Sequence, residues 1–360
     1  MSARTEVPPV GVETDVDLGH RMLAVHGERW SLRASLRAVL VVLVLVALAV
    51  VGILFSISTG TYDLPLADVV AGLLGTADEG TVLVVREWRL PRALLAALFG
   101  LALGVSGAVF QSITRNPLGS PDVIGFSSGS YTGALVVLLV TGGGYVAVAV
   151  GALTGGVLTA LAVFLLAYRR GVQTFRLIIV GIGVSALLAA LNTYLMLKAA
   201  PGEQLTAAVW GSGSLNGLTV DTLVPVLVVL GVLLVPVLVL APALRVLEVG
   251  DDAAGSLGAR PTTVRLVAVV LGVALVALVT ASAGPIAFIA LVAPQIARRL
   301  TRSAGVGLVA AGATGAVLLV ASDFLGQRLF APMQLPVGIV TVSVGGLYFV
   351  WLLVRETRRR

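Results

Sequence analysis

Residues 38–58 read AVLVVLVLVALAVVGILFSIS, an apolar run without a charged residue. A helix needs roughly 20 predominantly apolar residues to cross the hydrocarbon core of a bilayer, so this run predicts a transmembrane helix. It is too long for the hydrophobic region of a secretory signal peptide, and no small-residue cleavage site followed by more polar sequence accompanies it. We therefore expect a retained first span behind residues 1–34, a polar and mobile tail on the cytoplasmic side.

The composition extends this prediction to the rest of the chain. Of its 360 residues, 58% are hydrophobic and 12% are charged, and the mean hydropathy is +1.05; these values are far too apolar for an ordinary soluble domain. The net charge of +6 would suggest nucleic acid in a soluble protein. Here the arginines cluster beside apolar runs, as membrane topology requires, so we expect lipid and no nucleic acid. The absence of cysteine excludes a disulfide framework and a thiolate metal site.

Apolar segments recur throughout residues 35–357, which we interpret as one membrane domain. We predict an all-α membrane protein with ten transmembrane helices, at 36–57, 93–113, 122–141, 145–168, 176–197, 221–242, 264–283, 286–300, 305–323 and 336–354. The segment 286–300 is short and follows Pro285, so a partial or tilted helix is the alternative there.

Basic residues are unevenly distributed between alternate connections. If the amino terminus is cytoplasmic, the outer segments contain only Arg86, Arg89, Arg92, Lys198 and Arg328. The inner segments then hold the larger group: Arg115, Arg169, Arg170, Arg176, Arg245, Arg260, Arg265, Arg298, Arg299, Arg302, Arg355, Arg358, Arg359 and Arg360. Because an excess of Lys and Arg marks cytoplasmic loops, we predict that both termini are cytoplasmic.

The sequence offers little for an enzyme. A P-loop needs a lysine directly after a glycine-rich turn, but the only lysine, Lys198, follows Leu195-Met196-Leu197. The two histidines, His20 and His26, lie in the tail. We therefore expect no catalytic residue, no ATPase site, no cofactor and no bound metal.

The sequence also shows no obvious residue for coupling transport to a proton or sodium gradient. Carriers driven by protons or sodium usually place an ionisable group near the middle of the membrane. The acidic residues Asp122, Asp221 and Asp323 all fall at predicted span ends. The driving force is thus expected to come from another polypeptide, although sodium bound by backbone carbonyls would escape this reasoning.

The connection between the sixth and seventh spans contains a short amphipathic pattern. In residues 248–260, Asp251 or Asp252 can cap a helix that carries Ala253, Ala254 and Leu257, and Gly258 can end it. Such a helix on the cytoplasmic surface is a candidate docking site for a partner. An ordinary connecting turn explains the same spacing.

The outer arginines run against the charge bias of the chain. Arg86, Arg89 and Arg92 precede the second span, and Arg328 follows the ninth. They can pair with carboxylates of a docking protein, because an arginine fork binds a carboxylate through two bonds. Contact with lipid headgroups is the alternative.

Several motifs, in order, resemble one known family. They are Arg89-Leu90-Pro91-Arg92, residues 107–111, Arg115-Asn116-Pro117-Leu118-Gly119, residues 121–125, residues 250–258, residues 283–298, Ala321-Ser322-Asp323 and Leu335-Pro336-Val337-Gly338. Together they are similar to the FecCD family, the permease subunits of ABC importers for iron-siderophores, haem and vitamin B12. One departure is Gln295, where the family commonly has histidine.

The resemblance implies ten transmembrane helices per subunit and a pair of permeases, identical or paralogous, around a central path. It also implies two cytoplasmic ATPase subunits and an extracytoplasmic binding protein. Coupling to the ATPase is then assigned to Gly250, Asp251, Asp252, Ala253, Ala254, Gly255, Leu257 and Gly258. Docking of the binding protein is assigned to Arg89, Arg92 and Arg328.

The implied substrate is a ferric siderophore, and residues 213–217 look like those of permeases for catecholates such as ferric enterobactin. Import of vitamin B12 or haem by the same mechanism is an alternative. An ion-coupled secondary transporter and a membrane scaffold without transport are more distant ones. Small polar residues that can face the path, or can instead bond between helices, are Ser106, Gln111, Ser127, Ser128, Asn192 and Tyr194.

Overall fold

The computed structural model describes the chain except residues 1–21, 28–29, 61, 143, 169–173 and 358–360. A short hairpin, β1 (Met22–Gly27) and β2 (Trp30–Ser35), precedes the helices. The first half then comprises α1 (Leu36–Ser58), α2 (Leu66–Leu74), α3 (Glu79–Leu83), the π-helical turn η1 (Val84–Arg89), α4 (Leu90–Thr114), the 3₁₀ turn η2 (Pro121–Ile124), α5 (Phe126–Thr141), α6 (Tyr145–Ala167) and α7 (Thr174–Lys198). The second half comprises α8 (Pro201–Gly211), α9 (Val220–Val249), α10 (Asp251–Ser256), α11 (Pro261–Ala283), α12 (Ile289–Thr301), α13 (Leu308–Arg328) and α14 (Val337–Thr357).

A helix occupies each of the ten predicted spans, but the helices differ in length. Seven segments in the described part of the chain are long and apolar enough to cross a membrane: α1, the continuous stretch 79–114, α6, α7, α9, α11 and α13. The apolar helices at 126–141 and 337–348 are shorter. With 13 residues, α12 is about 20 Å long, less than the hydrocarbon core. The all-helical membrane architecture is thus established, while the count of ten crossings stays a prediction.

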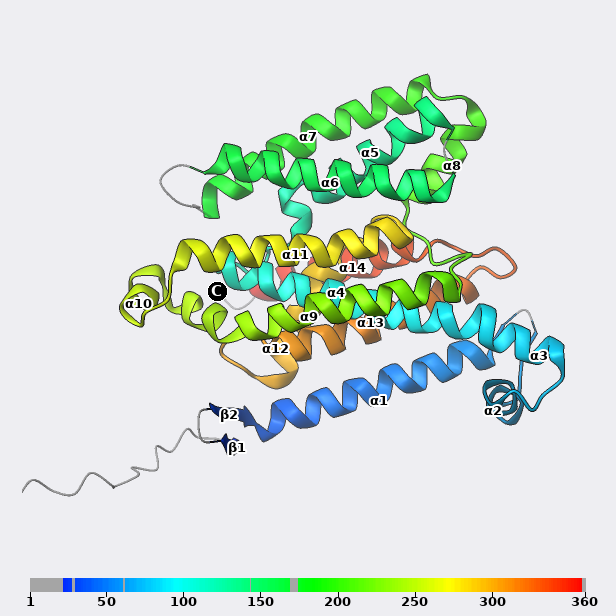
Figure 1. Cartoon of the computed structure of the whole chain (residues 1–360), viewed down its shortest axis with the longest axis horizontal. Helices are drawn as coiled ribbons and strands as arrows, with labels where there is room; N and C mark the ends of the chain where they lie inside the picture. Colours follow the sequence, from blue (N-terminus) through cyan, green and yellow to red (C-terminus); the bar gives the residue numbers. More distant parts are fainter. Residues whose placement is uncertain (1–21, 28–29, 61, 143, 169–173, 358–360) are drawn as a thin grey trace, which may run out of the picture.

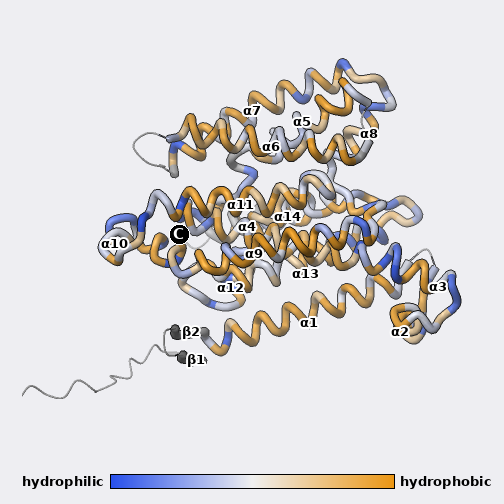
Figure 2. Tube along the Cα trace, in the orientation of Figure 1, coloured by the Kyte–Doolittle hydropathy of each residue, from blue (hydrophilic) through white to orange (hydrophobic). Residues whose placement is uncertain are grey.

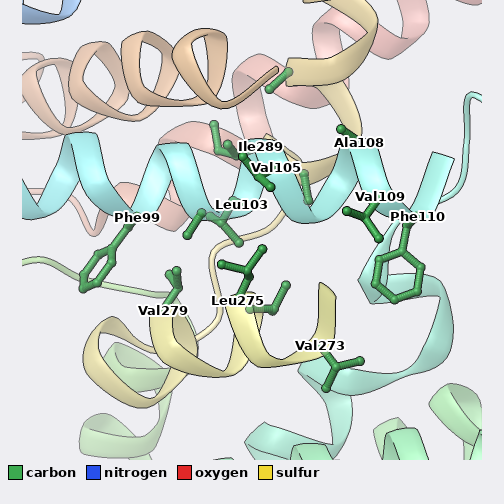
Figure 3. Close-up of a cluster of buried hydrophobic side chains, with 14 of the residues drawn as sticks. Phe99, Leu103, Val105, Ala108, Val109, Phe110, Val273, Leu275, Val279 and Ile289 are labelled. Atoms are coloured by element: carbon green, nitrogen blue, oxygen red, sulfur yellow. The ribbon is translucent and has the colours of Figure 1, made fainter. Parts of the chain in front are cut away.

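Helix α4 forms the centre of the molecule. It contacts α13, α11, α12, α9 and α1, and most of its side chains are buried. Figure 3 shows Phe99 and Leu103 of α4 on the side that faces Leu275 and Val279 of α11. The other helices of this group are therefore placed largely by their contact with α4.

Glycines let the backbones of α4, α12 and α13 touch. A β-carbon at Gly100 would lie 2.2 Å from the carbonyl oxygen of Gly315, and one at Gly104 would lie 2.3 Å from that of Ala311. At Gly107 the corresponding distance to Ala290 of α12 is 1.7 Å. No side chain fits at these positions, so the small residues set the spacing of the helices.

A second group consists of α5, α6, α7 and α8, at the top of Figure 1. Here too glycines meet, since a β-carbon at Gly133 of α5 would lie 2.0 Å from the carbonyl oxygen of Gly151 on α6. Contacts between α6 and α11 join this group to the first.

The two ends of the bundle differ in what they carry. The hairpin, α10 and the carboxyl end of α14 lie at one end, which we call the α10 end; α2 and α3 lie at the opposite, α2 end (Figure 1). Hydrophobic residues follow the helices between them, and hydrophilic residues gather near both ends (Figure 2). This arrangement suits a membrane layer between two aqueous surfaces.

The hairpin was not expected from the tail composition. Its strands pair antiparallel, with Met22 opposite Ser35 and Gly27 opposite Trp30. The expectation of a mobile tail over residues 1–34 stays a prediction, and residues 1–21 of it lie outside the described residues.

The glycine contacts generate a stability prediction. Gly107→Ala should lower the unfolding temperature of the detergent-purified protein, because the methyl group pushes α4 away from α12 at a cost of about 1–3 kcal/mol. Gly183→Ala on α7 is the matched control, since nothing lies within 4 Å of the added carbon. Equal unfolding temperatures for the two variants would contradict the proposed backbone contact.

Candidate functional site: two polar ends joined by α4

The α9–α10 corner projects from the α10 end. Its turns use glycines at Gly250 (φ 131°) and Gly258 (φ 82°), a backbone region that glycine tolerates best. Ala254 is fully buried, whereas the side chains of Val249 and Leu257 are 73% and 71% exposed. The corner thus presents an apolar tip to solvent.

The carboxylate of Asp251 connects three elements. Arg265 on α11 donates from both terminal nitrogens to the two carboxylate oxygens, with Nη1 2.8 Å from Oδ2. Arg115, just after α4, lies 3.4 Å from Oδ1. The expected capping role is wrong for both Asp251 and Asp252, because Gly250 is the N-cap residue and no side chain caps α10. The carboxylate instead holds α10 against α4 and α11.

A second carboxylate holds the same corner. The Oε1 atom of Glu248 accepts a hydrogen bond from the Ser112 hydroxyl of α4 at 2.6 Å and one from the Val306 amide at 3.3 Å. Glu248 therefore ties the end of α9 to α4 and to the connection between α12 and α13.

Gln295 is paired at this end as well. Its amide nitrogen donates to the carbonyl oxygen of Pro117 at 2.9 Å and to that of Leu291 at 3.2 Å. The residue that departs from the family pattern therefore fastens α12 to the connection after α4.

At the α2 end, two arginines cap helix ends. Arg86 donates to the carbonyl oxygen of Leu73 at 2.7 Å, near the end of α2. Arg89 donates to the carbonyl oxygen of Ile57 at 2.7 Å, near the end of α1, and to that of Tyr62. Cations are favoured at the carboxyl ends of helices, so Arg86 and Arg89 have a structural use within the chain.

Arg92 forms the most buried ion pair at this end. Its Nε lies 3.0 Å from Oδ2 of Asp323, and its Nη2 lies 2.9 Å from Oδ1. Asp323 is 2% exposed and also accepts a 2.7 Å hydrogen bond from Gln327. Because α13 continues to Arg328, Asp323 lies inside a helix, and the predicted span end at this residue is wrong.

A cavity of about 540 Å³ opens beside these arginines. Its lining includes Trp88, Arg89, Arg92, Gln327 and Gln334, together with the connection at 217–219. Arg328 lies nearby on α13 and pairs with Asp63 at 3.4 Å. The α2 end therefore offers a basic, partly aromatic hollow.

The six candidate path residues are not brought together within the chain. Ser106 and Gln111 are buried and donate to the carbonyl oxygens of Gly272 and Leu291, at 2.7 and 3.0 Å. Asn192 is buried between α5 and α7 and donates to the Ser128 carbonyl oxygen at 3.3 Å. These contacts are helix-to-helix bonds, so the assignment of these residues to a path stays a prediction.

The remaining two path candidates have different surroundings. Ser127 donates its hydroxyl hydrogen to Asp122. Tyr194 is 56% exposed on α7, where the Lys198 amine lies 5.8 Å from the ring centre.

Sequence reasoning missed the partners of both key carboxylates. The sequence presents Arg115 and Arg265 as charges of the predicted inner side, and Arg115 also as part of a family-like motif, but it pairs neither with Asp251. Arg92 and Asp323 are 231 positions apart. The one available signal was chemical: an acidic residue near a span end needs a cation when it is buried.

Comparisons with known proteins agree with this architecture. The FecCD transport family matches residues 40–355. The ferric enterobactin transport system permease protein FepG of Escherichia coli is 49% identical, over 91% of this chain and 99% of that protein. The achromobactin transport system permease protein CbrC of Dickeya dadantii is 37% identical, over 90% of this chain and 91% of that protein.

Solved structures are also similar, and one of them matches nearly over its whole length. It is described as an inward-facing conformation of an ABC transporter of metal-chelate type, and the TM-score is 0.78 at 26% identity. The match covers 88% of this chain and 99% of that chain.

The buried ion pair generates a second prediction. Arg92→Gln should lower the free energy of unfolding by about 3–5 kcal/mol, because it leaves the Asp323 carboxylate buried without its cation. The double variant Arg92→Gln, Asp323→Asn should recover much of this loss, since neither side chain is then charged. Thermal unfolding in detergent measures both. A double variant as unstable as Arg92→Gln would show that the ion pair is not the cause.

Proposed function

Because the chain belongs to the FecCD transport family, we propose that it is the permease subunit of an ABC importer that moves a ferric siderophore across the cytoplasmic membrane. The observation that carries this proposal is the 49% identity to the ferric enterobactin permease, over nearly its whole length. The apolar helices supply the membrane path, and ATP is hydrolysed on a separate subunit. This chain changes no covalent bond.

A catecholate is the favoured chelate. Identity falls from 49% for the ferric enterobactin permease to 37% for the achromobactin permease and 35% for an Fe(3+)-citrate permease of Bacillus subtilis. This decrease in sequence identity favours a ligand of the enterobactin class over one of the citrate class. Within residues 213–217, which carry the catecholate resemblance, Leu215 and Gly217 line the basic hollow.

The α9–α10 corner is the proposed contact for the ATPase. An exposed apolar tip on a polar surface is typical of a docking site, and Leu257 provides it at the α10 end. Closure of two ATPase subunits around ATP would move this corner and shift the permease pair between outward and inward access. The α10 end and both termini are then cytoplasmic, and α12 makes a partial crossing within a ten-helix subunit.

The α2 end is the proposed contact for the binding protein. Arg89, Arg92 and Arg328 surround or adjoin the basic hollow, and complementary charge guides the approach of an acidic partner. The three arginines differ in how available they are to a partner. Arg92 already holds Asp323, whereas Arg328 and its partner Asp63 have side chains that are 31% and 78% exposed, so Arg328 is the residue most available for exchange with a partner carboxylate.

The substrate proposal is tested by uptake. Cells that lack their own siderophore permeases should accumulate iron supplied as ferric enterobactin when this chain is expressed with its ATPase, its binding protein and any second permease. Ferric citrate, a ferric hydroxamate, haem and vitamin B12 should be taken up much less. Equal uptake of all five ligands, or preference for one of the other four, would contradict the catecholate assignment.

The docking proposal is tested by charge reversal. Arg328→Glu should weaken binding of the binding protein by about tenfold at low salt, because a favourable charge contact becomes repulsive. Arg328→Lys is the matched control and should bind nearly as well as the wild type. Reversing the facing acidic residue of the binding protein should restore affinity for Arg328→Glu. Equal affinity of all permease variants would favour contact of these arginines with lipid headgroups.

A further inference from the structure

Hydrogen bonds and ion pairs are the main contacts that hold the α9–α10 corner in place. Helix α10 has six residues, and among them only Ala254 is buried. Asp252, Gly255 and Ser256 are exposed. Apolar packing of this helix is therefore slight, and its position depends on the carboxylates beside it.

Two carboxylates, those of Glu248 and Asp251, contact residues at the carboxyl end of α4. Glu248 reaches Ser112 at 2.6 Å, and Asp251 reaches Arg115 at 3.4 Å. The same end of α4 is bonded to α12, because Gln111 donates to the Leu291 carbonyl oxygen at 3.0 Å. A displacement of the α9–α10 corner therefore pulls on the carboxyl end of α4.

Through Arg265, a displacement of the corner also reaches α11. It is 7% exposed and lies on the first turns of α11, where its planar guanidinium holds both oxygens of Asp251. A two-bond contact of this kind fixes direction as well as distance. Movement of Asp251 must consequently move α11 together with α4, as long as the pair is intact.

Helix α4 carries such movement across the molecule. Residues 79–114 form one helical segment of 36 residues, roughly 54 Å long. At its other end Arg92 is bonded to Asp323 of α13, and the basic hollow begins there. The segment thus connects the two polar ends of the bundle without interruption.

We infer that Asp251, held by Arg265 and Arg115, is the positioning residue that passes movement of the α9–α10 corner into α4 and α11. This inference rests on the proposed ABC function. The tip residue Leu257 contacts the ATPase. The Asp251 side chain, which is 42% exposed, is bonded to Arg265 and Arg115 and determines how much of the tip's movement reaches the membrane helices. Loss of the tie leaves the ATPase bound and active but poorly connected to transport.

The test uses the whole importer in liposomes and measures siderophore uptake per ATP hydrolysed. Asp251→Asn and Arg265→Gln should each lower this ratio by roughly fivefold or more, the range of a typical coupling free energy. Asp251→Glu, which keeps the charge, should restore most of it. The double variant should be no worse than the more severe single one, since both remove the same contact.

Two controls separate coupling from other effects. Arg245→Gln removes an exposed arginine on α9 and should leave the ratio unchanged. The amount of ATPase recovered with the permease should be normal for Asp251→Asn and reduced for Leu257→Asp. A wild-type ratio in Asp251→Asn, or loss of the ATPase from that variant, would overturn the inference.

A distance measurement reports the tie directly. The chain has no cysteine, so spin labels can be placed at Leu118→Cys and Ser256→Cys, both at exposed positions. Their separation should stay constant between nucleotide-free and ATP-bound states when Asp251 is present, and should change between these states in Asp251→Asn. A separation that changes equally in both proteins would also overturn the inference. Absence of ATP-driven uptake by the wild-type complex would instead refute the proposed function.

Discussion

The close contact between α4 and α13 is the constraint on which the rest of the structure depends. In a bilayer, apolar side chains gain little by exchanging contacts with lipid for contacts with one another. Helices therefore associate through close packing and polar contacts. Gly100 and Gly104 provide the packing, since their α-carbons lie directly against backbone atoms of α13. Arg92 and Asp323 provide the polar contact near one end of the same interface. Helices α1, α9, α11 and α12 then complete the group around α4.

The buried charges fit a subunit that takes its energy from elsewhere. Among the residues that the structure describes, Arg265 and Asp323 are the charged residues classed as buried. Each is engaged in an ion pair, with Asp251 and Arg92 respectively, and each lies toward an end of the bundle. Such pairs hold helices and connections in place. They support an account in which movement enters at the α10 end and ligand is received at the α2 end.

The sequence predicts the helices well because hydropathy is a local property. The run at 38–58 forms all but the first two residues of α1, and a helix occupies each of the other predicted spans. Residues 250–258 formed a short helix between glycine turns. These features depend on neighbours within a few positions, which a single sequence displays.

Contacts between distant segments were beyond this reasoning. Nothing in one sequence shows that α4 lies against α13, so local patterns make Arg92 an outer cation for a docking protein or lipid headgroups and place Asp323 at a span end. Local spacing is also insufficient for Asp251. It predicts a helix cap, whereas the Asp251 carboxylate pairs with Arg265 and Arg115. Local rules fail here because arginines from distant segments hold each carboxylate, and a two-bond contact with arginine is stronger than contact with a helix terminus.

The central claim is that this chain cannot concentrate its ligand without an ATP-hydrolysing partner. The most direct measurement compares liposomes that contain the permease alone with liposomes that contain it together with its ATPase, any second permease and its binding protein, with ATP on the ATPase side. The account predicts accumulation of ferric siderophore against its gradient only in the complete system. Accumulation by the permease alone, driven by a proton or sodium gradient, would contradict it.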